Sequence, residues 1–209
     1  MPRKRKAEQP AWVFLNCPFD EAYEETLRAL VFVIAQCGYR PACALEDDDS
    51  GRIRFEKLKA LISQSDLSIH DLSRTQVSIE TGVPRFNMPF ELGLYLGALH
   101  FGGRRQRVKR ALVLAAQRDH WAPALSDLAG VDPVFHRNQP RAVIRAVRDF
   151  LHRRPDGGIL PGEDALIRMY ERFRKDLRQL AIDSQLTEAE ALRYKNYLSF
   201  VTTFLATPR

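Results

Sequence analysis

The chain has 209 residues, 45% of them hydrophobic, which is enough for one globular domain of about 150 residues and an appendage. No apolar run reaches the roughly 18 residues of a membrane span, and the N-terminal MPRKRKAEQP lacks the apolar segment of a signal peptide, so we expect a cytoplasmic protein with no membrane partner. Cys17, Cys37 and Cys43 are an odd number without a CxxC pair, which argues against disulfides and against a thiolate metal site.

The net charge of +6 favours anionic partners, and arginine-rich stretches at 104–110 and 137–154 carry much of it. Nucleotides and nucleic acid both fit that charge. The basic residues are mixed with acidic ones and lack interleaved aromatics, so solvated helix faces are the simpler interpretation and nucleic-acid binding is an alternative. We expect residues 1–10 to form a disordered basic tail.

The first elements follow a strand, helix, strand pattern. Residues 12–16 (WVFLN) predict a strand that ends at Cys17 and Pro18, because proline removes a backbone donor. Helical spacing from Asp20 ends at Gly38, a favourable helix C-cap. Residues 41–45 predict a second strand, and apolar residues from Phe55 to Ile62 mark a second helix.

The same alternation continues to residue 151. We expect strands at 67–70, 111–116 and 133–135, helices at 87–101 and 140–151, and a loop with a turn of helix at 119–130. Strands that alternate with helices in this way predict a doubly wound, flavodoxin-like α/β domain over residues 11–154, with a parallel five-stranded sheet in the order 2-1-3-4-5.

Residues 155–209 form a linker, rich in proline and glycine, and a C-terminal helical hairpin. Its helices are expected at 163–182 and 188–205, the second opened by a Thr187-x-x-Glu190 capping box. Apolar residues on both helices indicate that the hairpin packs against something. It is a candidate lid, a candidate surface for a homo-oligomer, or a docking surface for a protein partner.

In an open parallel sheet a ligand binds beyond the carboxyl ends of the strands, beside the point where the strand order reverses. Polar and aromatic side chains that could contact a substrate gather at that edge or just before the third helix; they are Asn16, Phe19, Asp20, Glu46, Arg74, Arg85 and Asn87. Two carboxylates there are candidates for catalysis, Asp71 and Glu91. The sequence therefore predicts one site on this edge.

Glu91 is the only charged residue between Phe86 and Leu99. A carboxylate near a helix N-terminus is stabilised by the helix dipole, and a purely structural glutamate is the alternative. Removing a carboxylate from water costs free energy unless the group is paired with a partner or serves a function. The apolar neighbours of Glu91 therefore favour a catalytic role.

Three neighbouring groups have simpler alternatives. Asp71 is either a second functional acid or the cap of the turn at 73–75. His70 points to the opposite face of its strand from Asp71, so we interpret it as a core histidine and not as a dyad partner. Cys17 is interpreted as a packed thiol, with a nucleophile as the alternative.

No glycine-rich dinucleotide or P-loop motif follows the first strand. The acidic run after the second strand fails as a calcium loop because Lys57 occupies the twelfth position, although a weak magnesium site is an alternative. We expect neither a metal nor a cofactor, and we interpret Glu46 as a partner for a ribose hydroxyl.

Three motifs together carry a resemblance: the first strand running into NCPFD, the aspartate that ends the third strand, and the NMPFELGLYLGA helix. Over about residues 12–150 the chain resembles the nucleoside 2-deoxyribosyltransferase-like superfamily, which is close in plan to TIR-type domains. The resemblance implies that Glu91 matches the family's catalytic glutamate, which attacks the anomeric carbon of a nucleoside, or of NAD in TIR-type relatives. Such relatives often serve as toxic effectors in bacterial antiviral defence.

One position departs from the family. An aspartate that often precedes the glutamate by six residues is replaced here by Arg85, which favours hydrolysis, or a phosphate-bearing substrate, over base exchange. The resemblance, with this departure, thus implies an N-glycosidase for NAD or a nucleoside or nucleotide, with Glu91 stabilising or bonding the sugar and Asp71 as second acid. Two alternative hypotheses are a non-catalytic nucleotide-sensing or signalling module and a nucleic-acid-binding protein.

Overall fold

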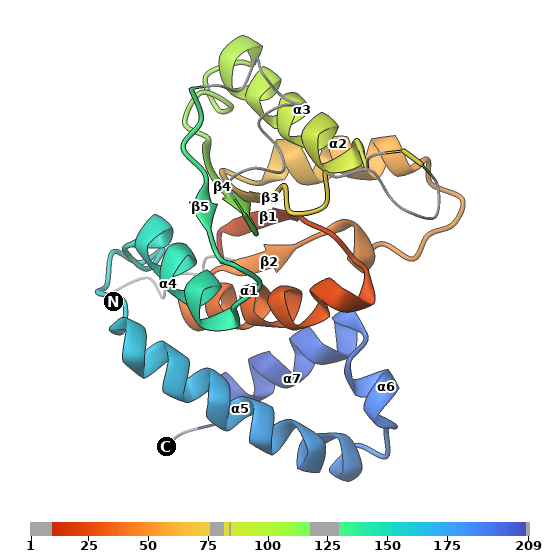
Figure 1. Ribbon diagram of the computed structural model, residues 1–209, viewed down its shortest axis with the longest axis vertical. Helices are drawn as coiled ribbons and strands as arrows, with labels where there is room; N and C mark the ends of the chain where they lie inside the picture. Colours follow the sequence, from red (N-terminus) through yellow and green to blue (C-terminus); the bar gives the residue numbers. More distant parts are fainter. Residues whose placement is uncertain (1–9, 76–81, 84, 118–129, 208–209) are drawn as a thin grey trace, which may run out of the picture.

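The computed structural model describes residues 10–75, 82–83, 85–117 and 130–207. Its sheet has five parallel strands in the order β2-β1-β3-β4-β5 (Figure 1). The strands are β1 (Trp12–Asn16), β2 (Arg40–Ala42), β3 (Leu67–Asp71), β4 (Arg110–Ala115) and β5 (Val134–Phe135). The predicted flavodoxin-like, doubly wound fold and its strand order are confirmed.

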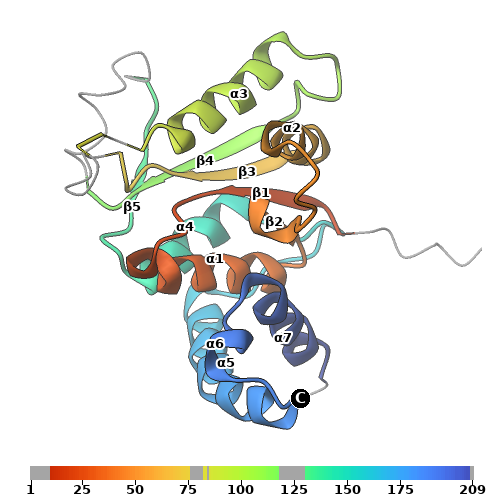
Figure 2. The ribbon, with the colours of Figure 1, turned by 90° about the vertical axis from the view of Figure 1, so that its right-hand side faces the viewer.

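Helices cover both faces of this sheet. They are α1 (Glu24–Gln36), α2 (Arg54–Gln64), α3 (Asn87–Phe101) and α4 (Pro140–Leu151), with short 3-10 turns η1 (Glu21–Tyr23) and η2 (Ala44–Glu46). Figure 2 shows α2 and α3 on one face and α1 and α4 on the other. Parallel strands must be covered on both sides in this way, because each crossover places a helix on one face or the other.

The C-terminal helices add a fourth layer, outside α1. They are α5 (Glu163–Asp183), α6 (Glu188–Ala191) and α7 (Tyr194–Ala206), and they pack against the side of α1 that faces away from the sheet (Figure 2). Phe32 of α1 stacks on Phe173 of α5 with ring centroids 5.4 Å apart, and Phe204 of α7 packs on both rings. The apolar face of the hairpin therefore has its partner within the chain.

Two predicted elements differ in the structure. The expected helix at 188–205 is broken into α6 and α7, because Arg193 is extended and Asn196 Nδ2 donates to the Glu190 carbonyl, ending α6. The break lets Tyr194 reach the edge strand β2, where its hydroxyl lies 3.2 Å from the Pro41 carbonyl. The second strand is also shorter than 41–45, since residues 44–46 form η2. The capping box of Thr187 and Glu190 is confirmed.

Two expectations lie outside the described residues: the disorder of the basic tail, except for its last residue, and most of the loop at 119–130. Within the part of the chain that is described, no helix is both long and apolar enough to cross a membrane.

Candidate functional site

The site is assembled where β1 and β3 end beside the first turn of α3. Asn16, the last residue of β1, is buried and donates from Nδ2 to the Met88 carbonyl at 2.8 Å. The same amide lies 2.8 Å from Nδ1 of His70 on β3. Asn16 thus holds the start of α3 over the ends of both strands, and its predicted contact with a substrate stays a prediction.

His70 is a core histidine, as predicted. Its ring is fully buried against Phe14 and Tyr95, and its Nε2 lies 2.9 Å from the Ser68 hydroxyl. Burial lowers the pKa of His70 to about 3, so the ring is neutral. The neighbouring Asp71 points to the other face of the sheet, as strand alternation requires.

Glu91 lies in the second turn of α3 and is half-buried. Burial raises the pKa of its carboxyl group to about 7, against a smaller lowering effect of Arg54. Within the described residues, no hydrogen bond or ion pair engages this carboxylate. The pKa of Glu91 therefore lies near neutral pH, and no described residue occupies its carboxylate.

The neighbours of Glu91 place it at the sheet edge. The pKa of the Cys17 thiol, just after β1, is raised mainly by burial and in part by the charge of Glu91. The pKa of Cys43, just after β2, is raised to about 12 by burial, with a smaller contribution from Glu91. The carboxylate thus lies within electrostatic reach of both strand ends, and neither thiol is a candidate nucleophile because both stay protonated.

Asp71 has a different environment from Glu91. It is fully buried and accepts hydrogen bonds from the Tyr23 hydroxyl at 2.5 Å, the Ser73 amide at 2.9 Å and the Ser73 hydroxyl, while His136 Nε2 lies 2.9 Å away. Burial alone would raise the pKa of Asp71, but these partners, His136 foremost, outweigh it and lower the pKa.

A buried, fully paired carboxylate with a lowered pKa is unsuited to giving a proton to a leaving group. Asp71 instead joins three segments that surround the site, through Tyr23 before α1, Ser73 after β3 and His136 after β5. The structure thus gives Asp71 a positioning role where the sequence analysis predicted a second acid, and the capping of Ser73 matches the alternative weighed there.

A charged cluster borders the site. Asp20, after β1, is 2.9 Å from Arg85 NH1 and 3.4 Å from Arg74 Nε. Arg85 is exposed and Arg74 half-buried, while Asn87 lies exposed at the start of α3. Sequence reasoning placed these residues together, and the structure does bring Asp20, Arg74 and Arg85 into one cluster.

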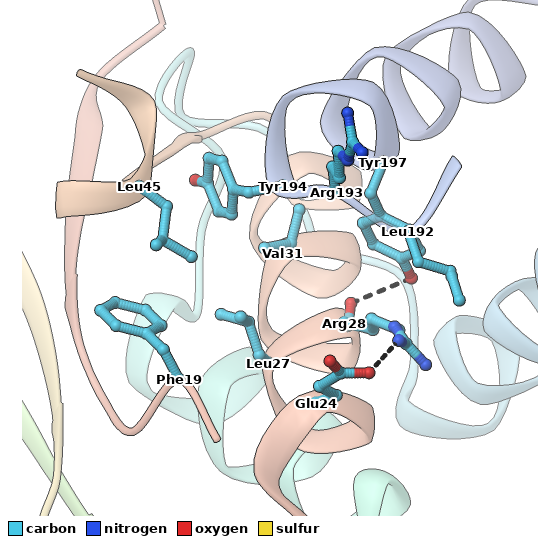
Figure 3. A pocket seen from close by; sticks show the side chains of 10 residues that line it. All are labelled: Phe19, Glu24, Leu27, Arg28, Val31, Leu45, Leu192, Arg193, Tyr194 and Tyr197. Atoms are coloured by element: carbon cyan, nitrogen blue, oxygen red, sulfur yellow. Dashed lines mark hydrogen bonds and ion pairs between the residues drawn. The ribbon is translucent and has the colours of Figure 1, made fainter. Parts of the chain in front are cut away.

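Phe19 lines a separate cavity, and Glu46 lies outside its lining. Phe19, Leu27, Leu45, Tyr194 and Tyr197 give most of the apolar lining to a space of about 200 Å³ between α1 and the C-terminal helices (Figure 3). Glu46 lies nearby, 2.5 Å from Arg40 NH2 and 3.3 Å from the Tyr194 hydroxyl. Glu46 is therefore engaged within the chain, and Glu91 does not line this cavity.

Two residues that complete the network around Asp71 were missed from sequence. Tyr23 has the spacing of an apolar helix face in the sequence, and nothing in that spacing reveals a buried partner for its hydroxyl. His136 directly follows the short strand β5, and a polar residue at the carboxyl end of a buried strand was an available signal. Among the described residues, no group of three or more His, Cys, Asp or Glu side chains is arranged to hold a metal ion.

No known protein family matches this sequence, and no curated protein or solved structure is significantly similar to the chain. The class that the structure defines is a flavodoxin-like α/β domain with an added helical layer.

Proposed function

We propose that the protein cleaves an N-glycosidic bond of NAD or of a nucleoside or nucleotide, with Glu91 as the catalytic group. The observation that carries this proposal is the half-buried carboxylate of Glu91, which has a pKa of about 7 and no partner among the described residues, at the sheet edge where ligands bind in this fold. Partial burial of a carboxylate costs free energy because the charged form loses water, and such groups are typical of functional sites.

In the proposed reaction the ionised Glu91 lies against the anomeric carbon. The bond from that carbon to the base breaks with both electrons going to the base, and a carboxylate oxygen bonds the sugar or stabilises its oxocarbenium-like charge. Water then adds to the anomeric carbon, loses a proton to solvent and releases Glu91 as the carboxylate.

The surroundings of Glu91 favour a leaving group that needs no proton. Asp71 was the acid expected to protonate a leaving base, but its carboxylate is already held by hydrogen bonds within the chain. Arg85 occupies the position where nucleoside deoxyribosyltransferases, which the chain resembles, often have an aspartate. The nicotinamide of NAD leaves as a neutral molecule and so fits this site better than an unprotonated purine or pyrimidine. Arg74 and Arg85 supply positive charge at the rim for its phosphates.

The experiment is an assay of base release. Wild-type protein is incubated with NAD and with a panel of nucleosides and nucleotides, and the products are separated by chromatography. We expect release from NAD or another phosphate-bearing compound, and its loss in Glu91→Gln. The matched control is Glu56→Gln, an exposed carboxylate on α2 that pairs with Lys59, which keeps full activity.

A non-catalytic nucleotide sensor is the second candidate. The Asp20 cluster favours it, because paired arginines at a rim can bind phosphates without any chemistry. Tight binding of NAD or a nucleotide with no base released would support the sensor and contradict the enzyme. We further propose a cytoplasmic location, which the three free, buried cysteines support, and a role as a bacterial defence effector, which rests on the resemblance alone.

A further inference from the structure

The outward face of α3 is an apolar surface without a cover in the described part of the chain. Its inner side is buried through Met88, Leu92 and Tyr95, which pack on the sheet and on α2. Half a turn away lie Phe86, Phe90 and Phe101, which are 61%, 55% and 92% exposed. Figures 1 and 2 show α3 on the outside of the molecule, on the side opposite to the C-terminal helices.

The outward stripe has helical spacing and no charge. It runs through Phe86, Phe90, Gly93, Gly97 and Phe101, and Leu94, which is half-buried and also packs on the core beneath the helix, lies at its border. A helix that is apolar on all sides is normally buried on all sides. Because the stripe has no charged side chain, burying it against another apolar surface would carry no cost of removing water from a charge.

Two glycines in the stripe have no explanation inside the described structure. A Cβ atom added to Gly93 or Gly97 would meet no atom within 4 Å. Glycine in a helix costs roughly 0.5–1 kcal/mol relative to alanine, so each weakens α3 with no packing gain in the described chain. Small residues of this kind allow a second helix to approach closely.

We propose that α3 pairs with α3 of a second copy of this chain, in an antiparallel dimer with a two-fold axis near Gly93 and Leu94. In this register Phe90 lies over Gly97 of the other copy, Phe86 lies against Phe101, and Leu94 lies over Gly93. Each bulky side chain thus meets a gap or another ring, and the same patch serves both copies, as a two-fold interface requires.

The available area suits a dimer. An aromatic side chain buries about 150–250 Å², so the uncovered parts of the three phenylalanines amount to about 400 Å² on each copy. Two copies would bury about 800 Å² through these rings alone, half of the roughly 1,600 Å² of a standard interface. Phe55 of α2 is 41% exposed and packs against Phe90, so it extends the same surface.

The test is the molar mass in solution, measured by sedimentation over a range of concentrations. We expect the wild type to be a dimer that dissociates on dilution. Phe90→Asp and Gly97→Leu should each raise the dissociation constant at least tenfold. The matched control is Ile182→Asp on α5, a residue 58% exposed on the opposite side of the molecule, which leaves the dimer unchanged.

Gly97→Ala separates the dimer from a simple effect on folding. Because the added methyl group meets open space in the single chain, it should raise the thermal unfolding temperature of the dilute monomer, while it weakens the dimer. A wild type that stays monomeric at all concentrations would overturn the proposal. So would a dimer that survives both Phe90→Asp and Gly97→Leu.

Discussion

Helices α1 and α3 are both largely apolar, but the chain covers them to different extents. Residues 29–34 of α1 are buried on every side, between the sheet and the C-terminal helices. Among the described residues, α3 is packed on one side only, Phe86, Phe90 and Phe101 are exposed on its outer side, and the carboxylate of Glu91 has no partner. A layer of three helices covers α1, whereas no described element covers the outer face of α3.

The largest expected effect concerns the cover of α1. Phe173→Ala removes a ring that is fully buried against Phe32 and Phe204, and we expect a loss of about 3–5 kcal/mol in the free energy of unfolding. Denaturant unfolding should still show one transition by fluorescence and by circular dichroism, because the hairpin and α1 share a core. The control, Ile182→Ala on the same helix, changes stability by less than about 0.5 kcal/mol. Two separate transitions would show that the hairpin folds independently.

A smaller effect is expected at Asp71. Asp71→Asn replaces an acceptor of several hydrogen bonds by a group that is half donor, so Tyr23, Ser73 or His136 loses a partner, at a cost of about 2–4 kcal/mol. Tyr23→Phe removes only one of these bonds and should cost about 1 kcal/mol. Denaturant titration measures both values. An unchanged stability in Asp71→Asn would contradict the positioning role.

Glu91 should behave in the opposite way. Since its pKa is raised in the folded state, its contribution to stability is present below pH 4.5 and is lost as the pH rises through about 7. Glu91→Gln should therefore be more stable than the wild type at pH 8, by about 1–3 kcal/mol after allowance for partial exposure, and equally stable near pH 4. Thermal unfolding at the two pH values measures this, with Glu56→Gln as control. A loss of stability at pH 8 would indicate a structural ion pair.

The smallest expected effect is on the pH profile of catalysis. Because the proposed reaction needs the ionised carboxylate, kcat/KM should fall about tenfold for each pH unit below the pKa of about 7. A plot of base release against pH measures this decline. A decline that begins only near pH 4.5 would assign the reaction to an ordinary, exposed carboxylate.

Much of the fold could be predicted from the sequence because its elements are local patterns. β1, α3 and α4 have the predicted bounds, since an apolar run, a proline or a change of periodicity marks each end. The break between α6 and α7 could not be predicted, because the helical spacing continues through Leu192 and Arg193. It depends on a contact of Tyr194 with a strand some 150 positions earlier.

The place of the candidate acids in the fold could be predicted from the sequence, but the residues that pair with them could not. Strand ends indicated where Asp71 and Glu91 would lie, because parallel strands finish at one edge. Whether a carboxylate is satisfied depends on residues distant in the chain, such as His136 for Asp71. Two acids that look equivalent in sequence are therefore opposite in the structure: one is buried with partners, and the other is left without one in the described chain.

In the proposed function the carboxylate of Glu91 on α3 carries the chemistry. The most direct measurement is the rate of base release from NAD or a nucleotide by wild type and by Glu91→Gln, with folding checked by thermal unfolding. We expect the wild type to release base and Glu91→Gln, while still folded, to lose at least about 1,000-fold of the rate, the order expected for a nucleophile. Equal rates for the two proteins, or no release by the wild type from any compound of the panel, would contradict it.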